Sequence, residues 1–140
     1  MSAAVLTAES LLGLKPTAPI AMHDALLEGL PFSALAKFLE KSGLPPADVY
    51  AVLDIPARTL VRRKSAGRLS SDESIHLHRL SGLFEQTLEM FSGGGKSARE
   101  WLTEPHHTFD GRRPIDLAQT PLGTKQVEGL IWQIRNGVII

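Results

Sequence analysis

The stretch that decides the fold is PADVYAVLDIPARTLVRRKSA, residues 46–66. Its apolar residues recur with the helical period on both sides of a three-residue break, Asp54-Ile55-Pro56. Pro45-Pro46 can open the first helix, because proline is tolerated in a first helical turn. Ala57–Ala66 is predicted as a second helix, which Gly67 ends. Two short helices joined by a tight turn predict a helix-turn-helix motif.

The turn of this motif departs from the usual pattern at one position. Asp54 stands where glycine is common in such turns. Aspartate tolerates the left-handed backbone conformation better than most residues do. We therefore expect the turn to form at some energetic cost.

The second helix carries a cluster of basic side chains, since residues 54–70 hold five basic residues against one acidic residue. At about 100° per residue, Arg58 and Arg62 point away from Leu60, and Thr59 flanks them. Such a face can enter a major groove, where arginine reads guanine and other basic groups hold phosphates. The alternative is a scaffold that keeps this shape without binding DNA. The candidate DNA-binding residues are Arg58, Thr59, Arg62, Arg63, Lys64 and Arg68.

The segments around the motif also have the helical period. A helix over Phe32–Ser42 is predicted to end at Gly43, and a longer one runs from about Ser71 to Phe91. The apolar stripe of this longer helix either covers the preceding helices or forms a dimer interface. No strand-like alternation of useful length is present, so the predicted fold class is all-α. The stripe consists of Leu77, Leu80, Phe84, Leu88 and Phe91.

Gly93-Gly94-Gly95 marks the one clear boundary in the chain. The sequence predicts a tail or short helix over 1–20, a helical domain over 21–92 with the helix-turn-helix at 46–66, and a C-terminal module over 96–140. In this module Trp101 is expected in the core, Pro114 to open a brief helix, and Thr120 to cap the last helix.

The last helix is predicted to have two different faces. Val127, Leu130, Ile131 and Ile134 have the spacing of a buried stripe, whereas Trp132 lies about 140° round from Val127 on the polar face. An exposed indole is an interface candidate, because it offers a large contact area at low entropic cost. The alternative is a surface tryptophan that lies flat on a neighbouring helix.

A loop of glycine and paired arginines precedes the brief helix. It reads Gly111-Arg112-Arg113-Pro114-Ile115-Asp116-Leu117. Either the arginines meet an acidic or nucleotide-binding surface on a partner, or one of them pairs with Asp116 or with a helix C-terminus.

With this loop as its strongest match, the segment from Pro46 to Gly137 resembles the Xre/MbcA/ParS antitoxins, the partners of RES-domain toxins. The resemblance implies an Xre-like helix-turn-helix core, a long connecting helix and a small C-terminal toxin-binding module. It also implies an antitoxin that blocks the active site of a cognate RES-domain, NAD-degrading toxin, forms homodimers and represses its own operon by binding operator DNA. The candidate toxin-binding residues are Arg112, Arg113, Lys125, Glu128, Trp132, Arg135, Asn136, Ile139 and Ile140.

Composition favours a binding protein over an enzyme. The 140 residues include 43% hydrophobic residues and no cysteine, which fits a folded cytoplasmic protein. Glu9 interrupts the apolar start of the chain, which argues against a signal peptide, and no run of about 18 apolar residues predicts a membrane span. His106-His107 lacks a third metal ligand, and neither a cofactor nor a catalytic triad is predicted. The alternative function is a stand-alone transcriptional regulator with a C-terminal oligomerisation or effector module.

Overall fold

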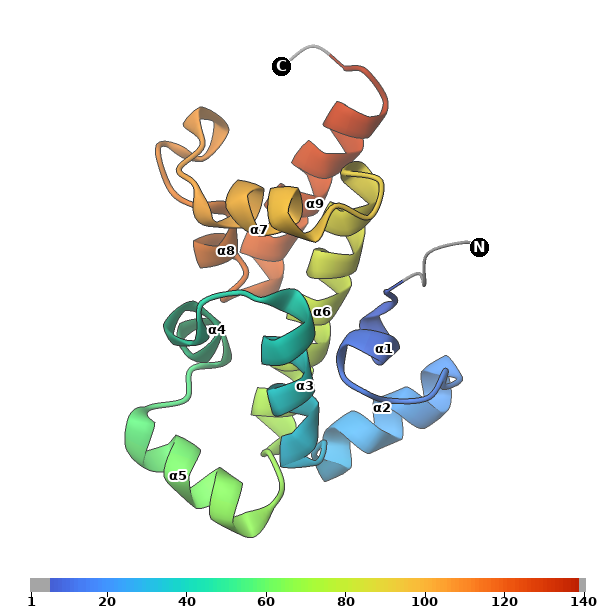
Figure 1. Cartoon of the computed structure of the whole chain (residues 1–140), viewed down its shortest axis with the longest axis vertical. Coiled ribbons are helices and arrows are strands. Elements are labelled where there is room, and N and C mark those ends of the chain that lie inside the picture. Colours follow the sequence, from blue (N-terminus) through green and yellow to red (C-terminus); the bar gives the residue numbers. More distant parts are fainter. Residues whose placement is uncertain (1–5, 139–140) are drawn as a thin grey trace.

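The computed structural model describes residues 6–138. Within that range the chain forms nine α-helices and one short 3₁₀ helix, η1 (His107–Phe109), and no strand, which confirms the all-α prediction (Figure 1). The α-helices are α1 (Ala8–Leu11), α2 (Pro19–Glu28), α3 (Phe32–Ser42), α4 (Pro46–Leu53), α5 (Ala57–Ala66), α6 (Ser71–Met90), α7 (Gly95–Thr103), α8 (Pro114–Leu117) and α9 (Pro121–Arg135).

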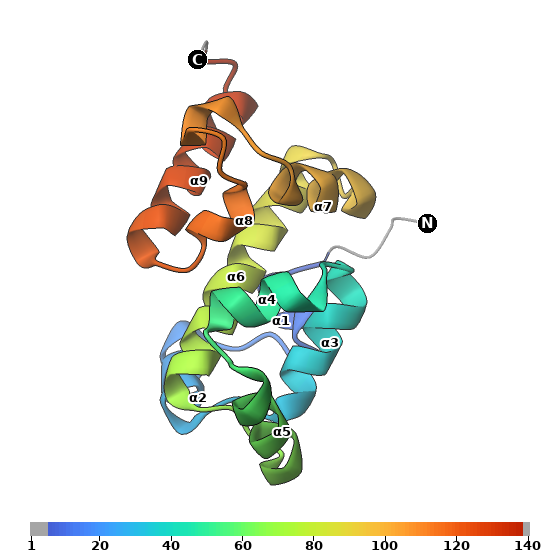
Figure 2. The same cartoon turned by 90° about the vertical axis from the view of Figure 1, so that its left-hand side faces the viewer.

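Helix α6 is the axis of the molecule. Helices α1, α2, α3, α4, α7 and α9 all pack against it, with α2 near its start and α7 near its end (Figure 2). A capping box begins the helix: Glu73 N donates to Ser70 Oγ at 3.1 Å, and Ser70 N donates to Glu73 Oε1 at 2.8 Å. One long helix therefore connects the two ends of the fold.

The apolar stripe of α6 lies inside the chain's own core. Leu77, Leu80, Phe84 and Leu88 are buried, and the ring of Phe84 meets the ring of Phe38 from α3 edge to face, with centroids 6.2 Å apart. Phe91, at the end of the stripe, is partly buried. The stripe thus covers the preceding helices, the first of the two interpretations that the sequence allowed.

The N-terminal segment also contributes to this core. Leu11 and Leu12 are buried, and α1 packs on α6. The backbone N–H of Ala8 donates to Glu85 Oε2 of α6 at 2.9 Å. Residues whose role the sequence left undecided therefore help to hold the central helix.

The helix-turn-helix prediction is confirmed in its local geometry. Asp54 adopts the left-handed conformation that we expected, with φ 56° and ψ 48° between α4 and α5. Helix α5 has no buried residue and protrudes from the end of the molecule opposite α9 (Figures 1 and 2). Its apolar side chain Leu60 is partly buried against the core.

The C-terminal module packs through α7, α8 and α9. Thr120 Oγ1 accepts a hydrogen bond from Gly123 N at 2.9 Å, so the predicted cap of α9 is present. Val127, Leu130 and Ile131 are buried as expected.

Two expectations for the C-terminal module need correction. Ile134 is 40% exposed, because the last turn of α9 extends beyond the end of α6 (Figure 1). Trp101 is only partly buried and lies beside the ring of His106, with centroids 6.2 Å apart.

Candidate functional site

Helix α5 presents one exposed stripe of side chains to solvent. Arg58, Val61, Arg62 and Ser65 lie at i, i+3, i+4 and i+7 and are all exposed, with Val61 at 69%. Arg62 Nη2 donates to Thr59 Oγ1 at 3.3 Å, which holds these two predicted DNA-binding side chains together. The stripe therefore offers two guanidinium groups on a protruding helix.

Two other predicted DNA-binding residues hold α5 in place. Arg63 Nε pairs with Glu73 Oε1 of α6 at 2.8 Å. This hydrogen bond and the charge of Glu73 raise the pKa of Arg63. Arg68 Nη1 donates to the carbonyl oxygen of Gly29 at 2.5 Å. Both cations are engaged within the protein, whereas Lys64 is exposed and forms no ion pair within residues 6–138.

The partner of Arg63 is itself unusual, because Glu73 is a buried carboxylate. Burial by itself raises the pKa of Glu73, but the hydrogen bonds from Arg63 and Ser70 outweigh it, so that the net pKa is lowered. Glu73 thus caps α6 and anchors α5 with one charged group.

At the other end of the molecule, α9 carries an exposed polar face around Trp132. The indole is 61% exposed, which leaves it available to a partner rather than buried by a neighbouring helix. Arg135 Nη1 pairs with Glu89 Oε2 of α6 at 3.0 Å, and Asn136 Nδ2 donates to the carbonyl oxygen of Trp132 at 2.8 Å. Ile139 and Ile140 lie outside the described residues.

The two loop arginines have different surroundings. Arg113 forms two hydrogen bonds to Asp48 of α4, at 2.9 and 3.1 Å, and two to Asp116, at 2.7 and 3.0 Å. These carboxylates raise the pKa of Arg113. Arg112 is exposed and lies 3.7 Å from an oxygen of Asp110. Arg113 therefore fits the structural alternative that the sequence left open, and it joins the C-terminal module to the helix-turn-helix.

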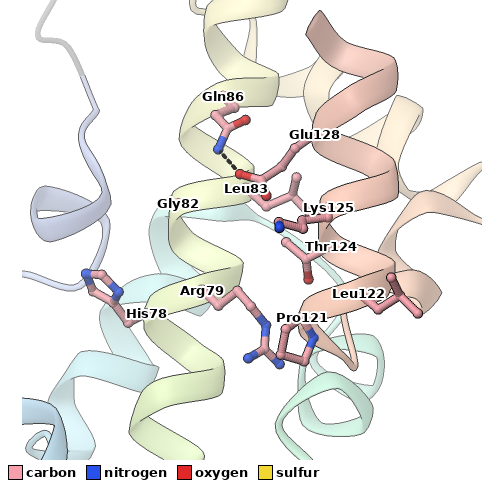
Figure 3. Close-up of a pocket in the computed structure, with 10 residues that line it drawn as sticks. All are labelled: His78, Arg79, Gly82, Leu83, Gln86, Pro121, Leu122, Thr124, Lys125 and Glu128. Atoms are coloured by element: carbon pink, nitrogen blue, oxygen red, sulfur yellow. Dashed lines mark hydrogen bonds between the residues drawn. The ribbon is translucent and has the colours of Figure 1, made fainter.

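Two adjoining grooves run between α6 and α9. The first, which we call the α6–α9 groove, has a volume of about 570 Å³ (Figure 3). The second has a volume of about 410 Å³ and includes Trp132, Arg135 and Asn136. Gln86 Nε2 donates to Glu128 Oε2 at 2.6 Å where the two grooves meet. The α6–α9 groove is lined by His78, Arg79, Gly82, Leu83, Gln86, Pro121, Leu122, Thr124, Lys125 and Glu128.

The described residues contain no group of three or more possible metal ligands, so that His106 and His107 do not form part of one. The two imidazole rings stack with centroids 4.7 Å apart. Burial and the charge of His107 lower the pKa of His106. No helix in residues 6–138 is long and apolar enough to cross a membrane.

The fold and its surfaces define a helix-turn-helix protein with an appended helical module. Residues 21–81 match the family model of the antitoxin Xre-like helix-turn-helix domain, and residues 86–137 match that of the antitoxin Xre/MbcA/ParS C-terminal toxin-binding domain.

Relatives of similar length agree with these matches. An antitoxin Xre of Pseudomonas putida is 32% identical over 117 residues, which cover 83% of this chain and 72% of the relative. An antitoxin Xre of Yersinia enterocolitica is 25% identical over 128 residues, which cover 91% and 86% of the two chains. The chain belongs to the Xre antitoxin family. Both matched domains are binding domains and neither is catalytic, in agreement with the residue inventory.

Sequence reasoning missed three residues that shape these surfaces. Asp48 pairs with a residue 65 positions away, which no local pattern reports. Gly123 is required by a close backbone approach, since an added Cβ would lie 2.0 Å from the carbonyl oxygen of Leu117. Arg79 lies in the wall of the α6–α9 groove, and an isolated arginine on a helix gave no signal of this.

Proposed function

We propose that this antitoxin neutralises a RES-domain, NAD-degrading toxin by blocking its active site, and represses its own operon through α5. The observation that carries the proposal is the separation of two surfaces, one on α5 and one on α9, by the length of α6. Helix α5, which carries the exposed arginine stripe, lies at one end of the molecule, and α9, which carries Trp132, extends to the other (Figure 2). Such an arrangement lets one chain bind DNA and a protein partner at the same time.

For DNA, the proposal assigns different tasks to the basic residues. Arg58 and Arg62 would enter the major groove, with Thr59 and Lys64 beside them, because their side chains are presented on the protruding helix. Arg63 and Arg68 would serve mainly to position α5, since both are engaged with the protein. A homodimer would place two copies of α5 on successive major grooves of operator DNA.

For the toxin, the proposed contact surface is the exposed face of α9 together with the adjoining loop. Trp132 would be its anchor, because a large, exposed aromatic side chain can bury much area on binding. The polar rim around it would be supplied by Lys125, Glu128, Arg135 and Asn136. Arg112, in the loop before α8, would add an exposed cation. Both activities would take place in the cytoplasm, where NAD and the operon are found.

The first test is co-expression of the chain with the product of the adjacent gene, followed by affinity purification and light scattering. We expect a stable heteromeric complex whose formation prevents NAD loss in the cells. A lone protein that binds its own promoter and ignores the neighbouring product would instead support the stand-alone regulator.

Two variants separate the proposed surfaces. Arg58→Ala combined with Arg62→Ala should abolish operator binding and leave toxin neutralisation intact, because the α5 stripe is far from α9. Trp132→Ala should have the converse effect, restoring toxicity while promoter binding persists. Loss of both activities in either variant, measured by gel shift and by growth on toxin induction, would mean that the surfaces are misassigned.

A further inference from the structure

Within residues 6–138, Arg79 of α6 is a cation in the α6–α9 groove that forms no ion pair. Its Nε is buried and has no hydrogen-bond partner in the described part of the chain, and its Nη2 reaches only the carbonyl oxygen of Gln119, at 3.3 Å. Burial lowers the pKa of Arg79, which reports surroundings that disfavour its charge. An unpaired, partly desolvated guanidinium carries a free-energy cost that an incoming anion would reduce.

A second cation lies in the same groove. Lys125 of α9 is exposed and forms no ion pair within residues 6–138. The carboxylate that lines the groove belongs to Glu128, and it accepts a hydrogen bond from Gln86 where the two grooves meet. The side chains of Arg79, Lys125 and Glu128 are shown in Figure 3. The groove lining therefore carries the two positive charges of Arg79 and Lys125 against the one negative charge of Glu128, and this excess of positive charge is complementary to an acidic group.

Apolar side chains line part of the groove, beside the polar His78, Gln86 and Thr124. Leu122 is 70% exposed, Leu83 is buried, and Pro121 also lines the groove (Figure 3). A nucleic-acid backbone offers phosphates but no apolar group to cover Leu122. A protein segment with an acidic side chain next to an aliphatic or aromatic one satisfies both parts of the groove.

We propose that the α6–α9 groove docks a toxin segment that carries an aspartate or glutamate beside an apolar side chain. The carboxylate pairs with Arg79 and Lys125, and the apolar side chain covers Leu122. This inference rests on the proposed function and gives the toxin a second contact beside Trp132. It also extends the toxin-binding surface upstream of residue 86, where the match to the C-terminal toxin-binding domain begins, onto the part of α6 that belongs to the helix-turn-helix match.

The test compares charge-removing variants in their affinity for the purified toxin obtained by co-expression. Arg79→Gln and Lys125→Gln should each weaken binding about tenfold in calorimetric titrations, because each removes one partner of a desolvated ion pair. The dependence of affinity on salt should also decrease. Arg58→Gln is the matched control: it removes the same charge from α5 and should leave toxin affinity unchanged.

A thermal unfolding measurement separates a binding role of Arg79 from a structural one. Arg79→Gln should keep or raise Tm, since it removes a buried N–H group that has no partner. Lys125→Gln tests the groove without this structural concern. The side chain of Lys125 is exposed, so its replacement leaves no cavity in the core.

The possible outcomes are distinguishable. Toxin affinity within twofold of the wild type in both groove variants would overturn the inference and leave the proposed function standing. Weaker operator binding with unchanged toxin affinity would overturn it as well, and would assign the groove to phosphate. Failure of the wild-type chain to bind the toxin would remove the proposed function and this inference together.

Discussion

At the scale of single residues, α8 and α9 approach each other closely at a glycine, Gly123. The carbonyl oxygen of Leu117 occupies the space where a side chain at position 123 would begin. Gly123 N also donates to Thr120 Oγ1, so that the same residue completes the cap of α9. The start of α9 is therefore fixed against the end of α8 by backbone contact.

We expect Gly123→Ala to destabilise the protein by about 1–3 kcal/mol, as is typical when a crowded site must shift to admit new atoms. Gly129→Ala is the control on the same helix, because a Cβ there meets nothing within 4 Å. It should stabilise the protein by about 0.4–1 kcal/mol, through the lower entropy of its unfolded chain. Urea unfolding measures both changes, and equal effects of the two substitutions would contradict this account of Gly123.

Glu73 makes the stability of the fold depend on pH, and its lowered pKa fixes the sign of this dependence. A carboxylate with a lower pKa in the folded state stabilises the fold above the unfolded pKa of about 4.5, and this contribution is lost as the pH falls through the folded value. Glu73→Gln retains capping capacity but loses the charge paired with Arg63. We expect the variant to be about 1 kcal/mol less stable at pH 7, and this difference to disappear on acidification. Urea unfolding between pH 7 and pH 3 would measure it, and a difference independent of pH would contradict the role of the charge.

At the scale of elements, an ion-pair cluster links α4 to the start of α8. Arg113 bridges Asp48 and Asp116 with four hydrogen bonds, and the side chains of Arg113 and Asp48 are mostly buried, at 32% and 19% exposed. The planar guanidinium suits this fork-like arrangement better than an ammonium group would. The toxin-binding domain is thereby attached to the helix-turn-helix through side chains as well as through α6.

Arg113→Lys and Asp48→Asn, alone and combined, should reveal a coupling free energy of at least about 0.5 kcal/mol in a double-mutant cycle. The reason is that the second substitution removes an interaction that the first has already lost. The exposed pair of Arg135 and Glu89 is the comparison, and its cycle should give less than about 0.5 kcal/mol. Additive effects of Arg113→Lys and Asp48→Asn would contradict a link between the two elements.

At the scale of the whole molecule, the sequence predicts the features that are set by interactions between residues close together in the chain. The helix ends at Gly43 and Gly67 and the cap at Thr120 follow from backbone preferences that act within a few residues. Contacts between distant segments have no such signal, which is why the partner of Arg113 in α4 was not predicted. Ile134 has the spacing of a buried residue, yet its exposure depends on where the neighbouring helix ends.

The same reasoning explains what could be predicted of the candidate surfaces. The outward direction of Arg58, Arg62 and Trp132 follows from helical periodicity alone. The pairing of Arg63 with Glu73 depends on how α5 docks on α6, and the sequence offers no measure of that. Which basic residues remain available to a partner is therefore a property of the folded chain.

Helix α5 contributes no buried side chain to the core. Substitutions on its solvent face consequently cost little in folding, whereas most positions on α6 are constrained from several sides at once. If α5 reads operator DNA as proposed, this face can therefore change its sequence preference without loss of the fold. Related antitoxins that share one cell could then diverge in the promoters that they recognise while they keep the same fold, and so remain insulated from one another's regulation.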